Sequence, residues 1–337
     1  MAWRHPSPIH RAQLIALVLL AALSSCTKGQ GPSSQANPYI APGVAAFVYD
    51  YRTEWVAAIK AYNGAASKRA DSHGRTLSYL LVGGGVLRIN SRSIADFSFN
   101  YSTTLLKAYA DDFPALSLIP IFGGRGGALL DSWGEADQRE LGKRIAEAVA
   151  GDPLVPGILI DIEPMSLAHL PFYSELRKQL ASNHQRLWLF AGDKEPALYK
   201  AVDVVVLSGY DIGGTPVTPD VYGKRLRSYI KGVFDALRGG PPSLLVAVPV
   251  AASAEEYETQ FGSCSKVTGY SQEAWVSAAL AALCPFRGEP AFVGLTLWGF
   301  YGDQLENPSG SGCFSSPGTI SPANWQSVET FGDSCGH

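Results

Sequence analysis

Eight short apolar runs recur along the chain, at residues 43–51, 76–84, 116–124, 157–163, 186–192, 202–210, 243–250 and 292–300. They are rich in Val, Ile, Leu and aromatic residues, which predicts buried β-strands. A strand followed by a helical or loop segment, repeated over about 255 residues, has the order and size of an α/β protein built as a (β/α)8 TIM barrel. We therefore expect one barrel domain over residues 42–337.

Two of the intervening segments show clear helical periodicity. Apolar residues share one face in EADQRELGKRIAEAVA (135–150) and in VYGKRLRSYIKGVFDALR (221–238). The interval between the fifth and sixth runs has room only for a short helix around residues 195–201. A doubly wound open sheet has the same alternation of elements, and the sequence does not give the strand order that separates it from a barrel.

The N-terminus has the features of an export signal. Arg4 and Arg11 precede the apolar run AQLIALVLLAAL (12–23), which is too short for a membrane-spanning helix. The run ends in LSSC, which resembles the lipobox of bacterial lipoproteins and implies cleavage before Cys26 and lipidation of its sulfur. We expect a signal peptide over residues 1–25 and a Gly-, Pro- and Ser-rich tether over residues 26–41. Thr27 in place of aspartate favours the outer membrane, to which the lipid would anchor the protein.

Composition excludes several classes of function. A formal net charge of −3 gives no polyanion-binding character, so nucleic acid is not an expected partner. The six histidines are scattered and no CxxC occurs, so we expect no metal site and no cofactor. The sequence contains no GxSxG, GxxxxGK[ST] or HExxH motif, which are the starting points for serine-hydrolase, nucleotide-binding and zinc-protease chemistry.

Apart from Cys26, the chain has four cysteines: Cys264, Cys284, Cys313 and Cys335. An even number in an exported protein predicts two disulfides. Four cysteines allow three pairings. Short loops favour Cys264 with Cys284 and Cys313 with Cys335, although the sequence leaves the other pairings open. We expect the loop-rich tail, residues 302–337, to be a disulfide-fastened cover of the same domain.

The run GILIDIE contains the strongest functional signal. Alternate side chains of a strand leave the same face, so Leu159, Asp161 and Glu163 point one way and the isoleucines between them point the other. An apolar face beside a face that becomes acidic at its end is typical of a barrel strand that opens into an active site. A structural alternative is that the two carboxylates cap a helix or pair with an arginine.

The ends of other strands supply candidate partners for these carboxylates, because strand ends converge at the C-terminal opening of a barrel. Glycines allow a ligand to approach the backbone, a tyrosine can donate a hydrogen bond, and a tryptophan can form an apolar floor beneath a sugar ring. The candidate substrate-binding residues are Gly123, Gly124, Tyr210, Asp211, Trp298 and Tyr49.

These residues resemble the motifs of glycoside hydrolase family 18, the chitinases and endo-β-N-acetylglucosaminidases. The family pattern DGxDxDxE maps onto residues 156–163 and matches Gly157, Asp161 and Glu163. The family's SxGG, MxYD and final tryptophan resemble IFGG (121–124), SGYD (208–211) and Trp298. Pro156 and Leu159 replace the first two aspartates of the pattern, so the carboxylate that in the family shares a proton with the middle aspartate is missing.

The resemblance implies hydrolysis of glycans that contain β-linked N-acetylglucosamine, by a retaining mechanism in which the substrate's acetamido group is the nucleophile. Glu163 would be the acid and base, Asp161 would orient the acetamido group, and Tyr210 would hydrogen-bond its oxygen. The alternative is a carbohydrate-binding lipoprotein on the same barrel without turnover. Glu163 favours the enzyme, whereas Leu159 favours the binding protein.

Overall fold

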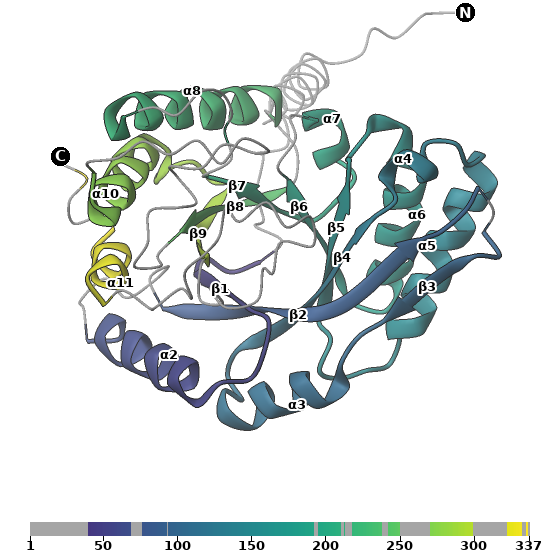
Figure 1. Cartoon of the computed structure of the whole chain (residues 1–337), viewed down its shortest axis with the longest axis horizontal. Helices are drawn as coiled ribbons and strands as arrows, with labels where there is room; N and C mark the ends of the chain where they lie inside the picture. Colours follow the sequence, from purple (N-terminus) through teal and green to yellow (C-terminus); the bar gives the residue numbers. More distant parts are fainter. Residues whose placement is uncertain are drawn as a thin grey trace, which may run out of the picture. The chain divides into compact units, whose positions relative to one another are not determined.

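The structure is a computed structural model that describes residues 40–68, 76–92, 94–191, 195–209, 212, 218–237, 242–249, 270–298, 322–331 and 335. Eight parallel strands lie inside a ring of helices (Figure 1). They are β1 (Val44–Val48), β2 (Leu77–Ile89), β4 (Ser117–Arg125), β5 (Gly157–Glu163), β6 (Arg186–Ala191), β7 (Val204–Ser208), β8 (Ser243–Pro249) and β9 (Phe292–Trp298). β1 pairs with both β2 and β9, so the sheet is closed. The predicted TIM barrel is confirmed, because an open sheet would leave two strand edges unpaired.

Helices and short helical turns connect the strands. They are α2 (Thr53–Ala66), α3 (Thr103–Asp112), α4 (Gly127–Leu130), α5 (Glu135–Val149), η1 (Leu167–His169), α6 (Leu170–Ser182), α7 (Pro196–Tyr199), α8 (Pro219–Leu237), α10 (Gln272–Leu283), η2 (Cys284–Phe286) and α11 (Pro322–Glu329). The two helices predicted from periodicity are α5 and α8, and α7 is the short helix expected between β6 and β7.

Aromatic rings from opposite walls meet inside the barrel. The rings of Phe47 on β1 and Phe190 on β6 lie 5.9 Å apart between centroids. Those of Tyr79 on β2 and Trp188 on β6 lie 5.3 Å apart. Strands from opposite walls can bring their side chains together only through the interior, so these residues mark the inward faces of β1, β2 and β6. The interior is a packed core beneath the opening, as in other small barrels.

β2 continues beyond the barrel wall, and there it pairs antiparallel with an additional strand, β3 (Phe97–Asn100). β3 is only 4 residues long and was not among the strands predicted from the sequence. The register of β2 against β4 shifts between Val82 and Gly85, across three consecutive glycines, of which Gly84 has φ +84°, a conformation that favours glycine. The ring of Phe99 on β3 stacks on Phe122 of β4 with centroids 4.2 Å apart, which holds the hairpin against the barrel.

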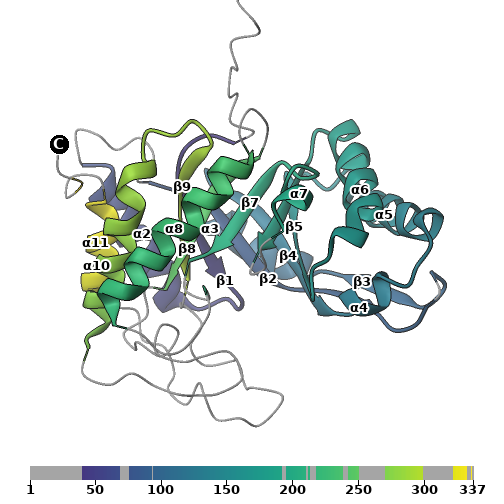
Figure 2. The ribbon, with the colours of Figure 1, turned by 90° about the horizontal axis from the view of Figure 1, so that it is seen from above.

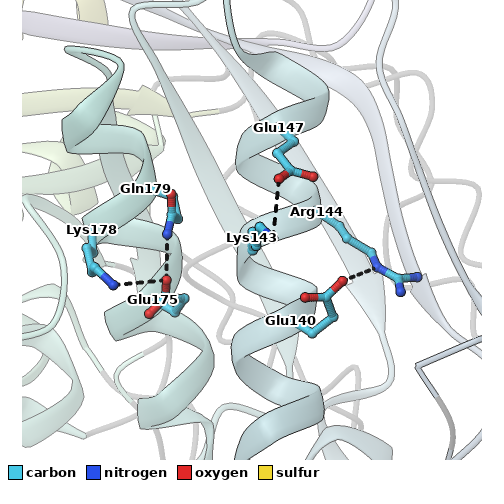
Figure 3. Close-up of polar contacts among 7 residues, drawn as sticks. All are labelled: Glu140, Lys143, Arg144, Glu147, Glu175, Lys178 and Gln179. Carbon is cyan, nitrogen blue, oxygen red and sulfur yellow. Dashed lines mark hydrogen bonds and ion pairs between the residues drawn. The ribbon is translucent and has the colours of Figure 1, made fainter.

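α5 and α6 pack side by side on the flank of β4 and β5 (Figure 2). Their close approach requires Gly142, because a Cβ there would lie 2.9 Å from the backbone nitrogen of Leu176. The outer faces of both helices are charged. Figure 3 shows seven of these residues, whose ion pairs and hydrogen bonds stay within one helix, such as Arg144 with Glu140 at 2.8 Å and Gln179 with Glu175 at 2.6 Å. Exposed pairs of this kind contribute little to stability, so these faces are solvated surface.

The C-terminal tail contributes a helix to the ring. α11 contacts both α10 and α2, and the ring of Trp325 packs edge-on against Tyr62 with centroids 5.4 Å apart. This packing brings the chain end back to the end of α10, where Cys284 and Cys335 form a disulfide. The favoured pairing of Cys284 with Cys264, and of Cys335 with Cys313, is therefore wrong. Cys264 and Cys313 lie outside the described residues.

The signal peptide, Cys26 and the tether are expectations about residues 1–41, of which only 40 and 41 are described. Within the described part of the chain, no helix is both long enough and apolar enough to cross a membrane.

Candidate active site

Both predicted carboxylates project from the inner face of β5. Leu159 is in register with Trp188 of β6, whose ring meets Tyr79 inside the barrel, so Leu159 also points inward. Alternation then places Asp161 and Glu163 on the same face, successively nearer the C-terminal opening. Exposure rises in the same order, since Leu159 is fully buried, Asp161 is half-buried and Glu163 is exposed. The acid nearest the opening is thus the one that an incoming ligand can reach.

Gly123 of β4 lies directly beside Asp161. The two residues are in register, and among the described residues a Cβ built on Gly123 would meet no atom closer than 4.0 Å, the distance to both Asp161 Oδ2 and Asp161 O. The missing side chain therefore leaves open space against the Asp161 carboxyl group. The neighbouring Gly124 has a different reason to be glycine, because its Cβ would lie 1.9 Å from the carbonyl oxygen of Leu87. Of the two predicted glycines, Gly123 borders the site and Gly124 permits the packing of β4 against β2.

The electrostatic environment favours the neutral form of Asp161. Burial is the larger cause and the neighbouring carboxylate of Glu163 the smaller one, and together they raise the pKa of Asp161 to about 7. The pKa of the Tyr173 phenol on α6 is also raised, first by burial and then by the charge of Asp161. The site therefore holds a proton at Asp161 under mildly acidic conditions, where an ordinary aspartate would be ionised.

This raised pKa predicts a pH dependence of stability. Unfolding returns Asp161 to its ordinary pKa of 3.8, so between about pH 4 and pH 7 the folded chain binds more protons than the unfolded chain. The stability that the folded protein gains from this extra proton binding is fully present below pH 4. It is lost as the pH rises to 7, by up to about 4 kcal/mol. We expect Asp161→Asn to remove this loss, so that urea unfolding at pH 4, 5.5 and 7 gives a variant that gains stability over wild type as the pH rises. Parallel pH profiles for the two proteins would contradict the assignment.

The floor beneath Asp161 is apolar. Leu159 is fully buried and lies in register between Ile121 of β4 and Trp188 of β6, which are 3% and 1% exposed. The position at which the family pattern has a carboxylate is thus part of the hydrophobic core. Asp161 has Glu163 as its acidic neighbour along the inner face of β5 and an apolar layer below.

Tyr49 follows β1 and is half-buried. Its ring lies parallel to that of Phe47, with centroids 6.5 Å apart, and occupies the space that a side chain at Gly83 would fill. The ring therefore lies on the same inward face of β1 as Phe47, one step nearer the C-terminal end of the strand.

The remaining predicted residues are Tyr210, Asp211 and Trp298. Tyr210 and Asp211 lie outside the described residues, as does the side chain of Trp298, whose backbone ends β9. The backbone that leads to Tyr210 is fixed, because Gly209 N donates to Ala247 O at 3.0 Å and its carbonyl accepts a hydrogen bond from the Tyr222 hydroxyl.

His169, which was not among the predicted site residues, lies six residues beyond Glu163 and has a fully buried side chain. A single histidine among scattered ones carries no signal for such a role. Two further glycines, Gly126 and Gly127, contact the end of β5 at Glu163 and Pro164. Across the described ranges, no cluster of three or more His, Cys, Asp or Glu side chains is arranged to hold a metal ion.

No protein-family model matches the sequence, and no curated protein is significantly similar to it. Solved structures do resemble it. The class V chitinase of Pseudomonas fluorescens Pf-5 superposes with a TM-score of 0.51 at 16% identity, covering 86% of this chain and 99% of that chain. The chitinase of Chromobacterium violaceum ATCC 12472 gives a TM-score of 0.50 at 12% identity, covering 86% and 98%. At these identities the likeness is one of fold, and the chain shares the (β/α)8 barrel of these chitinases.

Proposed function

We propose that the protein is a glycoside hydrolase that cleaves glycans containing β-linked N-acetylglucosamine. The observation that carries the proposal is the placement of Asp161 and Glu163, which leave the same inner face of β5 at the C-terminal opening and border the open space at Gly123. Active sites of TIM-barrel enzymes lie at this end of the barrel. The fold shared with two chitinases and the partial DGxDxDxE pattern support the same substrate class.

In the proposed reaction the substrate supplies its own nucleophile. The oxygen of the 2-acetamido group attacks the anomeric carbon while Glu163 donates its proton to the glycosidic oxygen. The bond between the anomeric carbon and the glycosidic oxygen breaks. The resulting oxazolinium ion retains the acetamido group as a ring. Glu163, now a carboxylate, removes a proton from water as the water oxygen attacks the anomeric carbon. This attack opens the oxazolinium ring and restores the original stereochemistry.

Asp161 is the orienting group in this scheme. It sits next to Glu163 on the inner face, so it can accept the acetamido N–H and stabilise the positive charge of the oxazolinium. Tyr210 would hydrogen-bond the acetamido oxygen beside Asp211, and Trp298 and Tyr49 would provide apolar surfaces for the sugar ring. The apolar residue Leu159 leaves this enzyme with a single orienting carboxylate.

The acetamido requirement tests the proposal. We expect the soluble domain, residues 27–337, to release reducing ends from N-acetylglucosamine oligomers, N-glycans or peptidoglycan. We expect fully deacetylated oligomers to be hydrolysed at least about 100-fold more slowly, since they lack the nucleophile. Comparable turnover of acetylated and deacetylated oligomers of the same length would exclude substrate assistance.

A second candidate function is carbohydrate binding without turnover on the same barrel. The observation that favours it is the fully buried Leu159 at the position of the family's carboxylate. This protein would bind the oligomers and release no reducing ends from any of them.

We also propose that the mature protein is anchored to the bacterial outer membrane through a lipid on Cys26, on the basis of the LSSC sequence after the apolar run. Incorporation of radiolabelled palmitate in cells would support the lipid anchor, and Cys26→Ser should abolish it. Labelling that persists in Cys26→Ser would contradict it.

A further inference from the structure

We propose that His169 is a positioning residue. Its hydrogen bonds clamp the turn that contains α4 against the end of β5, and this clamp fixes the backbone at Glu163. The inference rests on the proposed function for its catalytic consequence, whereas the clamp itself is a feature of the fold. No motif of the resemblance described above includes this histidine.

His169 reaches across to the segment that follows β4. Its side chain is fully buried, and Nε2 lies 3.0 Å from the carbonyl oxygen of Gly127 and 2.9 Å from Oδ1 of Asp131. Both partners accept, so the ring donates a shared Nε2–H to them. One side chain on the connection between β5 and α6 therefore holds both ends of α4, at its first residue, Gly127, and at Asp131, the residue that follows its last.

The same turn touches the end of the catalytic strand. Gly126 N donates to the carbonyl oxygen of Glu163 at 3.2 Å. Gly126 has φ +139°, and a Cβ on Gly127 would lie 1.8 Å from the carbonyl oxygen of Pro164, so the packing requires glycine at both positions. The contacts form a closed path from Glu163 through Gly126 and Gly127 to His169 and back along the chain.

The ring is suited to a fixed role. Burial lowers the pKa of His169, against the raising effects of Gly127 and Asp131, so the neutral form is favoured. Its Nδ1 is buried without a hydrogen-bond partner among the described residues. A buried Gln138 holds the other end of the turn, with Nε2 at 3.1 Å from Leu130 O and 3.3 Å from Trp133 O. Hydrogen bonds from two buried side chains thus hold the turn, and those of His169 are the ones next to Glu163.

The consequence for catalysis follows from the geometry of proton transfer. A general acid must sit within hydrogen-bond reach of the leaving oxygen, and a misplacement of about 1 Å can cost about 100-fold in rate. His169 does not touch the reacting atoms. Its loss should therefore lower kcat, because Glu163 is misplaced, and leave KM nearly unchanged, because the binding surfaces on other strands remain.

The test compares His169→Ala, which removes the donor, with His169→Gln, whose amide nitrogen can replace Nε2–H. We expect kcat of the Ala variant to fall at least about tenfold with KM within about twofold, and the Gln variant to recover most of the loss. Gln185→Ala is the matched control. Gln185 is likewise buried and also donates to two carbonyl oxygens, Val149 at 2.9 Å and Val155 at 2.8 Å, near the other end of β5. It should lower stability without lowering kcat.

Amide hydrogen exchange separates the clamp from the activity. Exchange should rise at residues 126–131 and 163–166 in His169→Ala and return in His169→Gln, whether or not the wild type hydrolyses any glycan. If the wild type is inactive and exchange behaves in this way, the proposed function fails and the clamp stands. Unchanged exchange in His169→Ala, or a fall in kcat no larger than that of Gln185→Ala, would overturn the inference. Should His169→Ala not fold, Asp131→Ala removes an acceptor of the same donor at a partly exposed site and should raise exchange in the same two segments.

Discussion

Glu163→Gln is expected to abolish glycan hydrolysis while leaving glycan binding intact. The amide has the shape of the acid but no proton to donate, and loss of a general acid costs about 100- to 10,000-fold. Glu163 is exposed at the opening, so the substitution leaves the packed interior of the barrel unchanged. The rate of reducing-end release and the affinity for N-acetylglucosamine oligomers should be measured on the same preparations, and we expect the dissociation constant to change by less than about twofold.

A surface carboxylate provides the control for this substitution. Glu135→Gln, on the exposed side of α5, makes the same chemical change outside the inner face of β5 and should retain wild-type turnover. Equal activity of Glu163→Gln and wild type would remove Glu163 from the mechanism. A wild-type protein that binds the oligomers and hydrolyses none, with equal binding by the variant, would establish the carbohydrate-binding protein instead.

Gly124→Ala should destabilise the barrel strongly. Its methyl group would lie 1.9 Å from the carbonyl oxygen of Leu87, and a backbone oxygen in a paired strand cannot move aside as a flexible side chain can. Overpacking typically costs about 1 to 3 kcal/mol, and the backbone contact places this case at or above the upper value. Urea or thermal unfolding would measure the loss of stability.

The adjacent residue provides a matched comparison. Gly123→Ala should fold with nearly wild-type stability, because its methyl group would meet no atom of the described part of the chain closer than 4.0 Å. The same methyl group enters the open space beside Asp161, so hydrolysis should fall although the protein is intact. Equal stability losses at the two positions would show that the close contact at Gly124 does not exist in solution, and undiminished hydrolysis by Gly123→Ala would exclude the space beside Asp161 from the substrate site.

Much of the barrel was predictable because it depends on local patterns. The eight runs of apolar residues became the eight barrel strands, since each run is buried on both faces and carries its own signal. The inward direction of Asp161 and Glu163 followed from strand alternation once the start of the run was known. The close contact of Gly124 with Leu87 could not be read from the sequence, because it depends on how two distant segments pack.

Other features depended on packing that a sequence does not encode locally. The Cys284–Cys335 disulfide joins residues 51 positions apart, and it forms because α11 returns the chain to the end of α10. Loop length alone favoured the wrong partners. His169 had no recognisable motif, since its role arises from a turn on another element, Gly127 to Asp131, that folds against it.

Closure of the barrel has a consequence for how the chain is made. β1 is among the first elements to be synthesised, yet one of its two pairing partners, β9, begins only at Phe292. Until that segment emerges, the nascent chain carries an unpaired parallel edge, which invites aggregation. Contacts between residues so far apart in sequence form slowly. The barrel can therefore close only once β9 has been synthesised, and a product truncated before Pro322 would lack the helix that covers Tyr62.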